Sequence, residues 1–204
     1  MSDKKYSIGS IGPRIDKFLR PILKQAGLEL DYEIVEGDSS NPEIENPEVV
    51  VRFSGRDVDI ALANKAQLLL ALEDVTMEAL RLPSEDHSRL SFDANDYRML
   101  RIEELRLSAT AAAEKVKSTG VPFRFNPMNS RERRVIHVAL RNESAVRSES
   151  AGFGGYRQVV IYPAGMASLP ELPPPPRSAG PRPDRDRGGP PRRDRPRSER
   201  PGRR

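Results

Sequence analysis

Basic side chains and one imidazole recur at helical spacing between Asn129 and Arg141. At about 100° per residue, an arc of roughly 100° on such a helix would hold Ser130, Arg133, Arg134, His137 and Arg141. A guanidinium fork matches two phosphate oxygens, and an imidazole can hydrogen-bond a phosphate or stack on a base. The rest of the helix is apolar and would face a core. The spacing therefore favours a nucleic-acid-binding face, with an ordinary solvated face as the alternative.

A glycine-rich turn at residues 152–155 precedes two further candidates, Tyr156 and Arg157. Arg157 would add a phosphate contact and Tyr156 a stacking ring, unless Tyr156 faces the core. The turn lacks the Lys-Ser/Thr pair and the following helix of a phosphate-binding loop, so it predicts no nucleotide site. Arg124 would extend the same basic surface.

The alternative to a binding role is an enzyme that cleaves phosphodiesters, with His137 and Glu132 as its acid–base pair. Glu132 lies three residues after Asn129, a capping-box spacing that would occupy its carboxylate. The chain has no cysteine and two histidines, which excludes thiol chemistry and disulfides and disfavours a histidine metal site. We therefore expect no enzyme, no metal and no cofactor.

Alternating helices and strands must position these residues. The apolar pattern predicts helices over 13–26, 58–82, 96–119 and 129–141, and strands over 28–35, 49–53, 87–93, 121–125, 146–150 and 157–162. Residues 37–48 are predicted to form a loop, and His87 to lie on a strand surface. The residues of the helix over 96–119 that are expected to face inward are Leu100, Leu105, Ala109, Ala112, Ala113 and Val116. This order predicts an α+β fold of two small domains.

Charge divides the chain into regions that its net charge of +4 conceals. Residues 1–87 carry a net −7, residues 88–164 a net +5 and residues 165–204 a net +6. We predict an N-terminal extension over 1–12, a first domain over 13–90, a second domain over 91–164 and a disordered Pro/Arg-rich tail over 165–204. The tail has too little apolar surface to offset its ordering entropy, and it is either an inert solubilising segment or a cationic arm. No apolar stretch approaches the ~18 residues of a membrane span, so we expect a cytoplasmic protein without membrane insertion.

Residues 127–137 resemble the core of the R-3-H domain, which is named for an arginine and a histidine separated by three residues. Their sequence is Pro127-Met128-Asn129-Ser130-Arg131-Glu132-Arg133-Arg134-Val135-Ile136-His137. Residues 92–94, 97–98, 119–120, 148–152 and 157–163 resemble the bacterial Jag family (SpoIIIJ-associated proteins), which pairs a KH domain with an R-3-H domain. The resemblance covers about residues 13–163.

The resemblance implies a type II KH-like domain followed by an R-3-H domain whose small sheet packs on helices. It implies that Arg133 and His137 bind single-stranded nucleic acid, RNA before DNA, without nuclease or helicase activity. It also implies a KH-protein partner, or self-association through the KH-like domain.

The KH-like half departs from the family pattern at its Gly-x-x-Gly loop, which aligns with Ala63-Asn64-Lys65-Ala66. A Cβ at each former glycine hinders close approach of a nucleic-acid backbone and favours a continuous helix. Asp57 and Asp59 lie just upstream and repel phosphate. We therefore expect this KH-like domain to be degenerate for RNA binding.

Together these features predict a non-catalytic protein that binds single-stranded RNA. The residues expected to carry the binding are Arg133, His137, Arg134, Arg141 and Arg157. The alternative is a protein–protein adaptor, in which the acidic KH-like half docks a partner and RNA binding is secondary.

Overall fold

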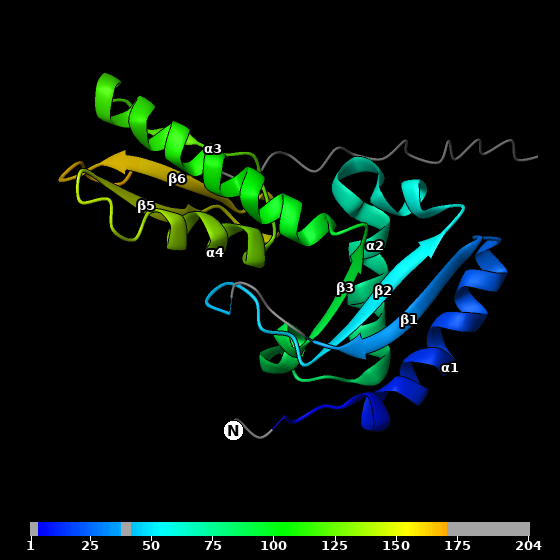
Figure 1. Cartoon of the computed structure of the whole chain (residues 1–204). Coiled ribbons are helices and arrows are strands. Elements are labelled where there is room, and N and C mark those ends of the chain that lie inside the picture. Colours follow the sequence, from blue (N-terminus) through cyan, green and yellow to red (C-terminus); the bar gives the residue numbers. More distant parts are fainter. Residues whose placement is uncertain (1–3, 38–41, 171–204) are drawn as a thin grey trace, which may run out of the picture. The chain divides into compact units, whose positions relative to one another are not determined.

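The computed structural model describes residues 4–37 and 42–170, which form two three-stranded sheets with helices packed on them (Figure 1). The first sheet has the order β1 (Leu30–Glu36), β2 (Val49–Gly55), β3 (Leu90–Ala94), with β1 antiparallel and β3 parallel to β2. The second has the order β4 (Phe123–Arg124), β6 (Gln158–Pro163), β5 (Val146–Ala151), and both of its pairings are antiparallel. The predicted α+β fold with small sheets on helices is confirmed.

The first core lies between the first sheet and two helices, α1 (Ile8–Ala26) and α2 (Val58–Leu80). The ring of Phe53 on β2 contacts Tyr32 and Phe92 on the flanking strands, with centroids 5.8 and 5.3 Å away. α1 begins at Ile8 rather than at Pro13, because Ser7 and Ser10 form a reciprocal capping box ahead of the predicted start.

The prediction of an uninterrupted helix over residues 58–82 is wrong at Ala63-Asn64-Lys65-Ala66. Ala63 is extended (φ −58°, ψ 153°), and the next three residues are left-handed, with φ between 52° and 63°. Ala61 and Ala66 are both fully buried in the first core, whereas on a continuous helix they would point about 140° apart. Tertiary packing therefore overrides the helix propensity of alanine at this position.

The predicted strand over 87–93 begins later than expected, at Leu90. Residues Ser84–Arg89 form a 3₁₀ turn instead, and His87 Nε2 lies 3.1 Å from the carbonyl oxygen of Leu82. The turn is held by buried Asp86, which accepts hydrogen bonds from Lys5 Nζ at 2.5 Å and from the Tyr6 hydroxyl at 2.8 Å. His87 is therefore not a strand residue.

The second core lies between α3 (Tyr97–Thr119), α4 (Ser130–Ala139) and the second sheet. Five of the six predicted inward residues of α3 are buried, but Leu100 is exposed, and Ile102 is buried instead. Leu100 falls about 140° from Leu105 around the helix, outside the stripe that faces the sheet. Ile44, from the loop ahead of β2, also packs into this core.

The tail prediction falls mostly on residues 171–204, which lie outside the described residues. None of the helices in the described part of the chain is long and apolar enough to cross a bilayer.

Candidate nucleic-acid interface

The helix that carries the predicted binding residues starts where the sequence predicts. Asn129 Oδ1 accepts from the Glu132 backbone N–H at 2.9 Å, and Glu132 Oε2 accepts from the Asn129 N–H at 3.2 Å. The capping box is thus confirmed. The other oxygen of Glu132 accepts from Arg101 Nε at 2.7 Å. The structure therefore gives both carboxylate oxygens of Glu132 partners other than His137.

Arg133 and His137 face strand β5, one helical turn apart. His137 Nδ1 lies 2.7 Å from Ser148 Oγ, and its Nε2 lies 3.0 Å from Ser150 Oγ. Arg133 Nη1 donates to the same Ser150 hydroxyl at 2.8 Å. The two serines point to one face of β5 because alternate strand residues share a side. This alternation is the signal in the sequence that would have identified them as partners of the helix.

Both nitrogens of the His137 imidazole lie close to protein side chains rather than in solvent. Burial first, and the Arg133 guanidinium second, lower its pKa below the ordinary value of 6.5. A neutral ring has one N–H donor and one acceptor nitrogen, and each lies within bonding distance of a serine hydroxyl. His137 therefore contacts both serines of β5, and one of them, Ser150, also accepts a hydrogen bond from Arg133.

Arg133 carries a charge that no carboxylate among the described residues neutralises. Burial first, and the nearby Arg157 cation second, lower its pKa, although a guanidinium remains protonated. Its Nε is buried without a hydrogen-bond partner in the described part of the chain. A desolvated cation beside a second cation is poised for an anionic ligand.

Arg157 lies directly before β6, and it is exposed. The Met128 N–H donates to its carbonyl oxygen at 3.0 Å, which fixes the residue beside the segment that enters α4. Tyr156 is 57% exposed, so the alternative of a core-facing ring is wrong.

Arg134 and Arg141 have a neighbour that the sequence did not predict. Arg134 Nε donates to the Glu43 carbonyl oxygen at 2.9 Å, and Arg141 Nη1 lies 3.4 Å from Glu43 Oε2. Glu43 is far from both arginines in the sequence, so helical spacing could not indicate this contact. An exposed pair of this kind is worth about 0–1 kcal/mol, so a phosphate can compete for Arg141.

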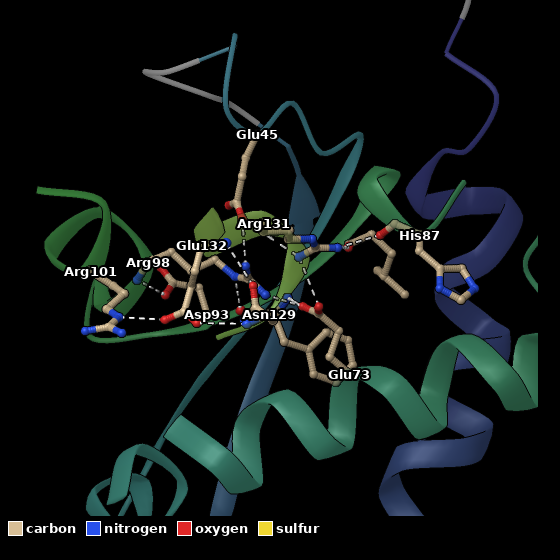
Figure 2. A network of polar contacts seen from close by, with 11 residues as sticks. Glu45, Glu73, His87, Asp93, Arg98, Arg101, Asn129, Arg131 and Glu132 are labelled. Carbon is tan, nitrogen blue, oxygen red and sulfur yellow. Dashed lines mark hydrogen bonds and ion pairs between the residues drawn. The ribbon is translucent and has the colours of Figure 1, made fainter. Parts of the chain in front are cut away.

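Arg131, on the opposite side of the same helix, belongs to a buried ion cluster that sequence reasoning missed (Figure 2). Its Nη1 lies 3.0 Å from Glu73 Oε1, and its Nη2 donates to the carbonyl oxygens of His87 and Leu90 at 2.6 and 3.1 Å. Arg98 pairs with Glu73 and, at 2.9 Å, with Glu45. The available signal was the place of Glu73 among the inward-facing residues of α2.

The ion cluster holds α4 against α2 and β3. Burial would lower the pKa of Arg98, but the carboxylates of Glu73 and Glu45 outweigh that effect and raise it. Glu73 also accepts from the Phe92 backbone N–H at 2.6 Å. The cationic charge of this cluster is thus matched inside the protein. Among residues 4–37 and 42–170, no group of three or more acidic, histidine or cysteine side chains is arranged to hold a metal ion.

Comparison with known proteins gives a family match and several relatives. The model of the R-3-H domain matches residues 103–163. Two proteins named "RNA-binding protein KhpB", from Clostridium symbiosum and Bacillus subtilis strain 168, are each 30% identical to this chain, over 145 and 164 residues. A third, from Lactiplantibacillus plantarum, is 26% identical over 144 residues. The alignment covers 71% of this chain and 63% of the Clostridium symbiosum protein, and 78% of this chain and 76% of the Bacillus subtilis protein. For the Lactiplantibacillus plantarum protein the shares are 71% and 42%. The first and the last of these relatives therefore extend well beyond the matched part.

Proposed function

The chain belongs to the KhpB family of R-3-H-domain proteins, and from this premise we propose that it binds single-stranded RNA through the side of α4 that faces β5. Arg133 would fork onto a phosphate, with Arg157 beside it and Arg134 and Arg141 supplying the surrounding positive field. His137 would act by holding Ser150 rather than by touching the ligand.

One observation carries this proposal. Among the described residues, the partly buried Arg133 donates a hydrogen bond only to a neutral hydroxyl and is repelled by Arg157, whereas Arg131 and Arg98 on the other side are neutralised by carboxylates. A protein gains nothing in stability from leaving a cation desolvated beside another cation. A phosphate supplies the missing charge and the missing acceptors.

We extend the proposal to the rest of the chain. Residues 13–90 form the KH-like domain, residues 91–164 the R-3-H domain, and the chain acts without catalysis, in the cytoplasm. The two separate apolar cores support this division. Whether a KH protein or a second copy docks on the KH-like domain is a distinct hypothesis, and no observation on this chain favours it over RNA binding.

The test is the salt dependence of binding to a labelled single-stranded RNA oligonucleotide, followed by anisotropy. For single strands the logarithm of the binding constant changes with the logarithm of salt concentration by about −0.7 per neutralised phosphate. We expect Arg133→Ala to weaken binding and to flatten this slope by roughly 0.7.

The matched control is Arg20→Ala, which removes an exposed arginine from α1 in the acidic half. It should leave affinity and slope unchanged. Loss of affinity equal to that of Arg133→Ala would show that any surface arginine suffices, and the proposed interface would be wrong.

A further inference from the structure

Two large aromatic rings project into solvent at the turn between β5 and β6. Phe153 is 59% exposed and Tyr156 is 57% exposed. Both follow directly from the strand that carries Ser148 and Ser150, the partners of His137 and Arg133. Single exposed apolar side chains are ordinary on a protein surface, so what distinguishes these two rings is their place in the chain, between Ser150 and Arg157.

The turn is built to hold these rings in place. Gly152 has φ +92°, and a Cβ there would lie 2.8 Å from the Tyr156 carbonyl oxygen, so only glycine allows the chain to close this tightly. Tyr156 N–H donates to the Phe153 carbonyl oxygen at 3.0 Å, and Arg157 N–H donates to that of Gly154 at 3.3 Å. The rings therefore sit on a short, closed 3₁₀ turn rather than on an open loop.

The same turn is fastened to the interface at both of its ends. Before it, Ser150 accepts from Arg133. After it, the Arg157 carbonyl oxygen accepts from Met128, one residue before the cap of α4. Arg157 lies close enough to Arg133 for the two charges to interact. The turn that carries the two rings is therefore anchored at both ends to the segment that bears Arg133. In chain order it has the Ser150 hydroxyl, the Phe153 ring, the Tyr156 ring and the Arg157 cation.

From this arrangement we propose that Phe153 and Tyr156 form a stacking platform for unpaired bases of the strand whose phosphates bind Arg133 and Arg157. Stacked bases on aromatic rings beside a cationic track are the means by which proteins hold single strands with little sequence preference. A duplex, whose bases are already stacked inside, would gain nothing from the rings. The inference rests on the proposed function and adds the reason why the strand must be single.

The decisive experiment separates bases from phosphates. Phe153→Ala and Tyr156→Ala are each titrated with a single-stranded RNA and with an abasic oligonucleotide of the same length. We expect each variant to bind the RNA roughly tenfold more weakly than the unchanged protein, since one stacked base is lost. Affinity for the abasic oligonucleotide should be unchanged. Arg157→Ala should weaken binding to both.

Controls for surface loss and ring loss are present in the chain. Leu107→Ala removes an exposed apolar side chain from α3 and should leave RNA affinity unchanged. Phe153→Tyr and Tyr156→Phe keep a ring at each position and should retain most of the affinity. Because both rings lie in solvent, these variants should fold like the unchanged protein, which circular dichroism checks.

A direct signal is also available because the chain has no tryptophan. In Phe153→Trp the introduced indole is the sole reporter, and we expect base stacking to quench its fluorescence with RNA but not with the abasic oligonucleotide. Leu107→Trp should show no quenching. If RNA binds and Arg133→Ala weakens it while both alanine variants at the turn bind normally, the platform is refuted and the interface stands. If the unchanged protein binds no RNA, the proposed function itself fails, and the stacking platform fails with it.

Discussion

Arg131 and Arg133 lie two positions apart on α4, about 200° around the helix, and their surroundings differ in charge. Arg131 points into a cluster with Glu73, Glu45 and Arg98, where carboxylates match the cations. Arg133 points towards β5, where it meets one serine hydroxyl and the field of another arginine. The same residue type on the same helix is thus matched by carboxylates on one side and, within the described part of the chain, by none on the other.

The surroundings of each arginine on α4 are set by its tertiary neighbours rather than by its place in a motif. Arg131, Arg133 and Arg134 are nearly consecutive in a basic run. The carboxylates that distinguish them come from Glu45 and Glu73, far away in the chain, and Glu43 meets the outer edge of the face. Among the described residues, Arg133 has no carboxylate partner, and Arg141 has only an exposed one.

The largest effect is expected from Glu73→Ala, which removes the central carboxylate of the buried ion cluster. The side chain of Glu73 is only 5% exposed, and its loss leaves Arg98, Arg131 and the Phe92 N–H short of an acceptor. We expect the free energy of unfolding, measured by urea denaturation, to fall by about 3–5 kcal/mol.

The control is Glu33→Ala, which removes one partner of an exposed pair with Arg52 on the first sheet. It should cost less than about 1 kcal/mol. An equally small loss for Glu73→Ala would contradict a stabilising role for the cluster.

The two serines of β5 test how the proposed RNA-binding side of α4 is positioned. Ser150→Ala removes the hydroxyl that both His137 and Arg133 contact, and we expect RNA affinity to fall roughly fivefold, or about 1 kcal/mol. Ser148→Ala removes a contact to His137 alone and should have a smaller effect. Anisotropy titrations measure both. The reverse order would show that Arg133 is not positioned through Ser150.

The left-handed backbone in the middle of α2 can also be tested by substitution. Lys65 has φ +63° and an exposed side chain, and a left-handed backbone costs an L-residue about 1–2 kcal/mol, so Lys65→Gly should raise the free energy of unfolding by about 1 kcal/mol. Ala63→Gly is the matched control, since Ala63 has an ordinary extended conformation, and it should not stabilise. Thermal unfolding distinguishes them. Equal effects would mean that helix propensity, not the left-handed backbone, governs this segment.

The smallest effect concerns pH. Because the folded protein lowers the pKa of His137, the unfolded chain binds the proton first as pH falls below about 6.5, and stability decreases there. His137→Asn should remove this part of the pH dependence of the free energy of unfolding. His87→Asn keeps His137 and should retain it. An unchanged pH profile in His137→Asn would contradict the proposed burial of a neutral ring.

Local patterns in the sequence predicted much of the fold. The Asn129–Glu132 spacing gave the start of α4, and the apolar periodicity gave the inward residues of α3 except Leu100. These features depend on neighbouring residues only. The break at Ala63–Ala66 was missed because it arises from the fit of two half-helices to one core.

The sequence predicted that the candidate residues share one side of α4, but not which contacts they make. Helical spacing placed Arg133 and His137 on one side, yet it could not show that two serines on β5 occupy both nitrogens of the ring. Nor could it show that a loop residue, Glu43, reaches Arg134 and Arg141. Such contacts depend on the packing of distant segments.

The most direct test of the account compares Arg131→Ala with Arg133→Ala in two measurements, urea denaturation and anisotropy with single-stranded RNA. We predict that Arg131→Ala lowers the free energy of unfolding by about 1–3 kcal/mol and leaves the RNA affinity of the folded protein unchanged. Arg133→Ala should lower affinity roughly ten- to hundredfold and leave stability within about 0.5 kcal/mol. If both variants lose affinity equally, or if Arg133→Ala is the destabilising one, the division of α4 into a structural side and a ligand side is wrong.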